Sequence, residues 1–199
     1  MKYLMYLMLF TLLMSCSDDN ETDEINVSLT NEEIENLQFL KEEEKLARDV
    51  YLFSFDLYNQ NIFKNIANSE QSHMNSVSVI IEKYDIQDLS FDERGKFSNN
   101  ELQQLYDDLV DLSKISLEDA LKVGATVEDL DINDLNIFIS NTLHQDVIEM
   151  YQLLNCGSRN HMRAFTNNLT NLGLVYNPQF ISLDEYNSII ESTNEKCNN

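Results

Sequence analysis

Apolar residues recur at intervals of three and four positions along most of this chain, which is typical of amphipathic helices and not of strands. The pattern predicts helices over residues 31–58, 62–84, 99–112, 116–141, 143–172 and 183–192. Thr30 and Glu33 mark the start of the first helix, because together they can form a capping box. We therefore predict an all-α fold: an up-down four-helix bundle with an extra helix in the crossover between its second and third long helices and a short C-terminal helical segment.

The N-terminal thirty residues lie outside this helical pattern. Residues 3–14 form an apolar stretch that follows the basic Lys2 and is too short to span a bilayer. The string Leu13-Met14-Ser15-Cys16 resembles the bacterial lipobox, in which the cysteine is acylated and becomes the new N-terminus. The predicted organisation is a lipoprotein signal peptide (residues 1–15), a lipidated Cys16 with a flexible acidic tether (16–30), the bundle (31–182) and a C-terminal tail (183–199).

A lipid on Cys16 would anchor the protein to a membrane of the cell envelope, on the periplasmic side of the outer membrane or at the cell surface. The alternative is an ordinary cleaved signal in which this cysteine is incidental. Export also bears on Cys156 and Cys197, because in an oxidising compartment they can form a disulfide that ties the tail to the last long helix. Two free thiols are the alternative for that pair.

Composition restricts the partners of the chain. It contains 35 acidic and 13 basic residues, which gives a net charge of −22. A field of this sign repels nucleic acid and anionic lipid headgroups, so nucleic-acid binding is not expected. The acidic pairs Glu42-Glu43 and Asp107-Asp108 are expected on solvated faces, and His144 is expected on the surface.

Six polar residues fall on the apolar faces of the four long helices, where core residues are expected. They are Glu44, Glu70, His73, Glu128, Asp131 and His161. A buried carboxylate needs a cation, a hydrogen-bonding network or a bound metal ion. Four inward-facing helices that each bring a carboxylate or an imidazole are typical of di-iron and di-manganese bundles.

Several strings in the chain extend this pattern to a known family. Glu44-x-x-Ala47-Arg48-x-x-Tyr51, followed by Glu70-x-x-His73, resembles the first two helices of rubrerythrin-type ferritin-like proteins. A wider set of strings resembles one family of that superfamily, which occurs in bacteria and archaea and is known as a domain of unknown function. These strings are residues 42–51, 69–74, 119–124 and 157–165. The resemblance covers residues 33–182, implies a ferritin-like fold and leaves the activity open.

Ser158 departs from the ferritin-like template, because it stands three positions before His161, where a glutamate is expected. The remaining candidate ligands can hold two metal ions if Asp131 reaches inward, or a single ion if it does not. Oxygen and imidazole ligands suit iron, including a di-iron pair, and also manganese or zinc. With iron, the resemblance implies reduction of oxygen or peroxide.

The alternative function is a non-enzymatic envelope binding or structural module without a cofactor. In that case the same residues form a buried salt-bridge and hydrogen-bond network that uses Arg48. Tyr51, Arg48 and Ser158 are expected beside the candidate ligands, with Tyr51 as a packing aromatic. Ferritin-like bundles often pair as homodimers, but the sequence assigns no interface and indicates no redox partner.

Overall fold

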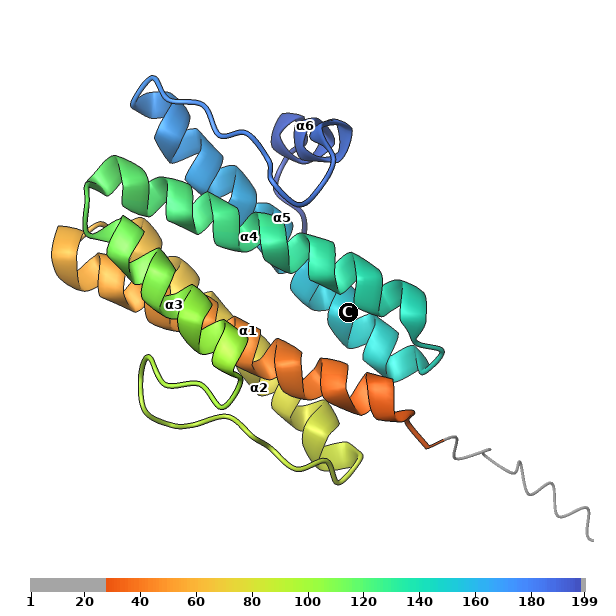
Figure 1. Ribbon diagram of the computed structural model, residues 1–199. Helices are drawn as coiled ribbons and strands as arrows, with labels where there is room; N and C mark the ends of the chain where they lie inside the picture. The colour runs from red at the N-terminus through yellow and green to blue at the C-terminus, as the bar shows by residue number, and fades with distance from the viewer. Residues whose placement is uncertain (1–27, 198–199) are drawn as a thin grey trace, which may run out of the picture.

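The protein is described from a computed structural model that covers residues 28–197. These residues form six helices and no strand, and every helix end lies within two residues of its predicted position. The helices are α1 (Asn31–Tyr58), α2 (Asn61–Lys83), α3 (Asn100–Ser113), α4 (Leu117–Asn141), α5 (Gln145–Asn171) and α6 (Leu183–Glu191) (Figure 1). The predicted all-α fold is confirmed. The predicted signal peptide and Cys16 lie outside the described residues.

Four long helices pack as two hairpins. α1 lies along α2, α4 lies along α5, and contacts of α1 with α4 and of α2 with α5 join the two pairs into a bundle. α3 packs against α1 and α4, and α6 packs against α5 (Figure 1). Within residues 28–197, no helix combines the length and the apolar character that crossing a membrane requires.

Local sequence signals explain where the helices begin. The Thr30 hydroxyl accepts the Glu33 N–H, and the Glu33 carboxylate accepts the Thr30 N–H, which completes the predicted capping box. Ser116 caps α4 by accepting the N–H of Asp119, and α1 ends where Asn59 adopts a left-handed conformation (φ 51°). These caps satisfy backbone groups that helix ends otherwise leave unpaired.

Two apolar clusters fill the bundle, one on each side of its middle. The larger cluster contains Tyr51 of α1, Phe63 of α2 and Phe165 of α5. The smaller cluster lies toward the other end and contains Leu37 of α1 and Leu154 of α5, among others. On α1, α2 and α5, the polar residues singled out from the sequence lie between the positions that enter these two clusters, and on α4 they lie between Val127 and Ile132 of the larger cluster.

Charged residues on α1 were wrongly assigned to a solvated face. Glu42 and Glu43 are each 2 % exposed, and Lys45 is completely buried. Glu42 accepts the backbone N–H groups of Ser98 and Asn99 at 2.6 and 3.0 Å, so it fastens the crossover that leads into α3. The prediction failed because the crossover covers Glu42 and because Glu43 faces Asp131 and Asp134 of α4.

Lys45 fastens the same crossover from a neighbouring position. Its ammonium pairs with Asp49 at 2.7 Å and donates to the backbone oxygens of Glu93 and Lys96 at 2.9 and 3.0 Å. Asp49 in turn accepts the N–H of Gly95, whose φ of +72° favours glycine. The crossover is therefore tied to α1 by buried charged groups.

His144 and the second acidic pair were predicted with different success. His144 is partly buried, and its Nδ1 lies 2.8 Å from a carboxylate oxygen of Glu33, so the surface prediction is wrong. Asp107 and Asp108 are exposed as expected.

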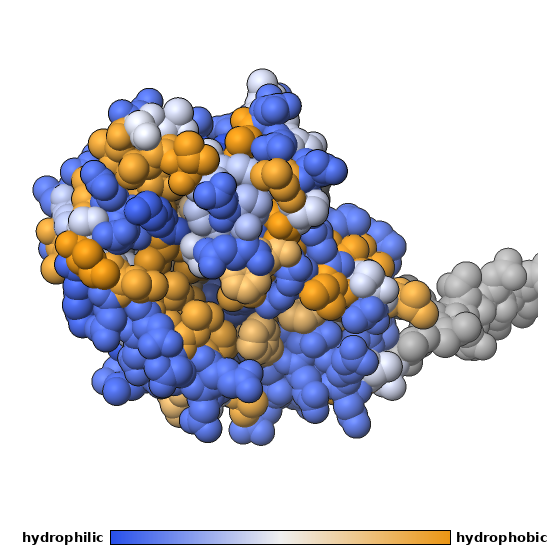
Figure 2. Space-filling view, turned by 45° about the horizontal axis from the view of Figure 1, so that its top comes forward, coloured by the Kyte–Doolittle hydropathy of each residue, from blue (hydrophilic) through white to orange (hydrophobic). Residues whose placement is uncertain are grey.

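On the face that Figure 2 shows, hydrophilic residues surround several groups of apolar residues, in keeping with the strongly acidic composition.

Candidate metal centre

A layer of polar side chains crosses the bundle between the two apolar clusters. α1, α2, α4 and α5 all contribute to it, and every member is at most 8 % exposed. We call this set the polar layer; its members are Glu44, Glu70, His73, Glu128, Asp131, Ser158 and His161. All six residues predicted as metal ligands therefore lie together in this layer.

Two triads of candidate ligands lie within the polar layer. The first is Glu44, Glu70 and His73, and the second is Glu70, Glu128 and His161. In each triad, one ligand atom from every residue lies within 4.8 Å of the others. The two imidazole rings are stacked with their centroids 5.5 Å apart.

Glu70 belongs to both triads and uses a different oxygen in each. Its Oε2 lies 2.8 Å from Nδ1 of His73, and its Oε1 lies 2.8 Å from Nδ1 of His161. His73 Nδ1 also lies 3.1 Å from Glu44 Oε2, and His161 Nδ1 lies 3.4 Å from Glu128 Oε2. Both histidines thus direct Nδ1 toward the carboxylates.

Asp131 enters the layer through Ser158. The Ser158 hydroxyl donates a hydrogen bond to Oδ2 of Asp131, and the other oxygen, Oδ1, has no hydrogen-bond partner. Burial raises the pKa of Asp131 to about 7, and the nearby charge of Glu128 contributes to the rise. Asp131 is not a member of either triad, but it interacts electrostatically with Glu44 and Glu70 as well.

The neighbouring carboxylates favour the protonated form of both histidines. Burial alone would lower the pKa of His161, but Glu70 and Glu128 raise it to about 10. Glu44 and Glu70 likewise raise the pKa of His73 above its usual range, against the effect of burial. In return, the two rings hold the pKa of Glu70 below its usual range although burial alone would raise it.

The remaining carboxylates of the layer are harder to ionise. Burial raises the pKa of Glu44, and the charge of Asp131 raises it further. Burial also raises the pKa of Glu128, against the lowering effect of His161. The layer therefore contains more acidic groups than its two histidines neutralise.

Tyr51 and Arg48 differ in their relation to the layer. The Tyr51 hydroxyl donates to Glu128 Oε1 at 2.5 Å, and burial together with Glu128 raises the pKa of Tyr51. Tyr51 also packs against Phe165, so it is both a packing aromatic and a hydrogen-bond donor to a candidate ligand. Arg48 binds Asp49 and Gln71 instead, and no bond among the described residues joins it to the layer.

Several residues beside the layer were not predicted from the sequence. A Cβ on Gly157 would lie 2.5 Å from Nε2 of His73, so glycine allows α5 to pass over that ring. Ser69 Oγ lies 2.9 Å from Nε2 of His161. The sequence could have indicated Gly157, because a glycine inside a helix costs about 1 kcal/mol relative to alanine and so often has a packing or functional reason.

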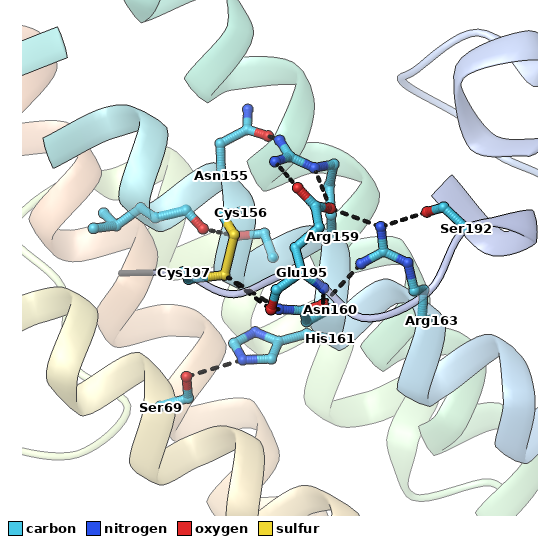
Figure 3. Close-up of a disulfide and its surroundings, with 12 residues drawn as sticks. Ser69, Asn155, Cys156, Arg159, Asn160, His161, Arg163, Ser192, Glu195 and Cys197 are labelled. Carbon is cyan, nitrogen blue, oxygen red and sulfur yellow. Dashed lines mark hydrogen bonds and ion pairs between the residues drawn. A yellow bond between two sulfur atoms is a disulfide. The ribbon is translucent and has the colours of Figure 1, made fainter. Parts of the chain in front are cut away.

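Cys156 and Cys197 are joined by a disulfide, one of the two alternatives that the sequence left open. Cys156 lies on α5 and Cys197 lies in the segment that follows α6. A surface pocket of about 350 Å³ adjoins the bond, and Cys197, His73 and His161 are among its lining residues. Figure 3 shows the disulfide with His161 and Ser69 nearby.

Comparison with known proteins identifies the family. A family model described as an uncharacterized protein domain, DUF2202, matches residues 10–193. The chain belongs to the DUF2202 family. This confirms the predicted resemblance to a family that is known as a domain of unknown function.

One relative resembles this DUF2202 chain in both sequence and fold. The chain is 50 % identical over 169 residues to the uncharacterized protein MJ0754 of Methanocaldococcus jannaschii. The aligned region covers 84 % of this chain and 91 % of that protein. The crystal structure of hypothetical protein MJ0754 matches with a TM-score of 0.84 over 85 % of this chain and 97 % of that chain. Both matches support membership of the DUF2202 family.

Proposed function

We propose that this DUF2202 protein is a ferritin-like metalloprotein whose polar layer binds two metal ions, and that with iron it reduces dioxygen or peroxide. The observation that carries the proposal is the position of Glu70. One carboxylate that directs its two oxygens to two different His–Glu triads has the arrangement of a ligand that bridges two ions.

Unpartnered atoms support the fit of a metal ion to these residues. Glu44 Oε1 and Asp131 Oδ1 are buried and have no hydrogen-bond partner, whereas Glu70 Oε1 and His161 Nδ1 face each other as an ion pair. Buried charged atoms without partners are strongly destabilising. Bound cations would satisfy the two unpartnered carboxylate oxygens.

The donor set also fits the proposed metals. Each triad offers two carboxylates and one imidazole nitrogen, so each ion would have three protein ligands and free positions for small molecules. Hard oxygen and imidazole donors suit iron, manganese and zinc. Iron bound there would supply the electrons for the reduction of dioxygen or peroxide.

The surrounding residues would hold the ligands and control protons. Tyr51 donates its hydroxyl proton to Glu128 and so orients that carboxylate. Ser158 of α5 does the same for Asp131 of the neighbouring helix α4. Because the pKa of both histidines is raised, metal binding at Nδ1 must release their protons. The apolar clusters on both sides keep bulk water away from the layer.

Metal analysis of matched variants tests the proposal. Reconstitution with ferrous iron should give about two ions per chain. Because Glu70 belongs to both triads, Glu70→Gln should lose both ions, whereas His73→Gln and His161→Gln should each lose one. Glu33→Gln is the control, because Glu33 is also a buried glutamate next to a histidine but lies outside the layer.

The same experiment distinguishes a metal site from a buried salt-bridge and hydrogen-bond network without metal. Protein that holds no stoichiometric metal, and whose melting temperature is unaffected by iron, manganese and zinc, would contradict the proposal. That outcome would favour a non-enzymatic envelope module, since the His–Glu ion pairs can neutralise part of the layer without a cation.

We further propose that a lipid on Cys16 anchors the protein in the cell envelope. The support is the lipobox-like string at residues 13–16. Cells grown with a labelled fatty acid should incorporate label into the wild-type protein and not into Cys16→Ala, which should leave the membrane fraction. A wild-type chain that carries no label would contradict this assignment.

A further inference from the structure

The Cys156–Cys197 disulfide adjoins the histidines of the polar layer. Cys156 immediately precedes Gly157, the residue over which the His73 ring lies. Cys197 lines the same surface pocket as His73 and His161. In Figure 3 the His161 imidazole lies between the disulfide and Ser69. The two sulfur atoms therefore lie at the surface side of the candidate metal centre.

Both histidines connect this pocket with the carboxylates. Each ring directs Nδ1 to the glutamates of its triad. Nε2 of His161 bonds to Ser69 Oγ, which lines the pocket, and Nε2 of His73 faces Gly157, which lines it as well. An ion bound at Nδ1 would thus be separated from the pocket by a single aromatic ring, which is a short route for electrons.

Contacts other than the disulfide already hold the C-terminal segment in place. Glu195 pairs with Arg159 at 2.5 Å and with Arg163 at 2.6 Å. Asn160 accepts the Glu195 N–H at 2.9 Å and donates to its carbonyl oxygen at 3.1 Å. Because these bonds lie two residues from Cys197, opening the disulfide would leave the two sulfurs close together and able to pair again.

Asn160 also contacts the sulfur itself. Its side-chain Nδ2 donates to Cys197 Sγ at 3.2 Å, as Figure 3 shows. A hydrogen bond of this kind stabilises negative charge on sulfur, and the thiolate is the reactive form of cysteine. Cys197 is partly exposed at the pocket, so an external dithiol can reach it.

From these contacts we infer that Cys156 and Cys197 are a reversible dithiol–disulfide couple that supplies electrons to the metal centre, an inference that rests on the proposed function. When the S–S bond forms, two S–H bonds break, two protons go to solvent and two electrons pass through the histidine rings. Ferric ions held by the two triads would receive these electrons, one each. With hydrogen peroxide as oxidant, the balance is one dithiol and one peroxide giving one disulfide and two water molecules, and an external dithiol reopens the bond.

The test follows the oxidation state of the cysteines instead of turnover. The purified protein is reduced, freed of reductant under anaerobic conditions and loaded with iron, with zinc or with no metal. Metal content is measured before one equivalent of hydrogen peroxide is added. At set times the free thiols are alkylated, and the intact mass reports the fraction of chains with a disulfide.

Iron-loaded protein should form the disulfide at least about tenfold faster than the zinc-loaded and metal-free samples, because zinc binds similar ligands but does not change oxidation state. The double variant Cys156→Ser/Cys197→Ser should bind the same amount of iron and keep its ferric absorbance, which the wild type should lose. Equal rates in all three samples would overturn the inference and leave the bond as a structural link. A chain that takes up no iron before peroxide is added would instead contradict the proposed function.

Discussion

Replacing Gly157 with alanine separates metal binding from folding. The added Cβ would lie 2.5 Å from Nε2 and 2.7 Å from Cε1 of His73, whereas ordinary contact begins at 3.4 Å. The ring must therefore retreat by about 0.9 Å, the difference between 3.4 and 2.5 Å, if α5 keeps its position. It cannot rotate freely to do so, because Nδ1 is held by both Glu44 and Glu70.

A displacement of this size should affect metal binding much more than the stability of the fold. Metal–ligand distances tolerate changes of only about 0.2 Å. The triad that contains His73 should therefore lose affinity by at least about 100-fold, or about 3 kcal/mol. In the metal-free protein, alanine gains about 1 kcal/mol of helix propensity, and overpacking costs about 1–3 kcal/mol. The free energy of unfolding should therefore fall by no more than about 2 kcal/mol.

Calorimetric titration of Gly157→Ala with ferrous iron and manganese, beside urea unfolding of the metal-free form, measures both quantities. Asn167→Ala is the control, because Asn167 is an exposed residue of α5 that lies outside the polar layer. We expect the variant to keep the triad of His161 and to lose the triad of His73. A variant that binds the wild-type amount of metal with unchanged affinity would refute the assignment of His73 as a ligand.

The structure supports three further predictions. In the metal-free protein, charged His161 (pKa raised from 6.5 to about 10) stabilises the fold fully below pH 6.5, and this contribution is lost as the pH rises to 10. The pKa of Asp131 is raised from 3.8 to about 7, so its protonated carboxyl group stabilises the fold at low pH and this stabilisation is lost between pH 3.8 and pH 7. Urea unfolding should therefore show a free energy of unfolding that falls from pH 4 to pH 10. Lys45→Met should cost about 3–5 kcal/mol because it leaves buried Asp49 with Arg48 but without its lysine and removes the donor to two backbone oxygens of the crossover, whereas Lys83→Met, at an exposed pair, should cost at most about 1 kcal/mol. Metal binding near pH 7 should release about three to four protons per chain, measured by calorimetry in buffers of different ionisation enthalpy.

The sequence predicts the long helices and the depth of the polar layer well, because both depend on local spacing. Glu44 and Glu70 interrupt regular apolar stripes, and a residue inside such a stripe faces the core whatever the other helices do. Caps such as Thr30 are likewise local, so the helix ends could be placed closely.

What the sequence could not predict depends on contacts between distant segments. Glu42 and Glu43 look like a solvated run, and only the covering crossover and α4 make them buried. His144 pairs with Glu33 across 111 positions, a separation at which no spacing rule applies. The sharing of Glu70 between two triads also required the coordinates, because spacing gives the face of a residue and not the direction of each oxygen.

The position of Asp131 changes the interpretation of Ser158. Taken alone, a serine in place of a ligand glutamate indicates lost chemistry. In the fold, its hydroxyl binds Asp131 of α4, so a carboxylate from the neighbouring helix lies beside the position where α5 lacks one. The polar layer then has four carboxylates, and two divalent ions with neutral histidines would balance their charge. Without metal, two imidazolium rings balance only half of it, and the raised pKa values of Glu44, Glu128 and Asp131 follow from burial together with that deficit.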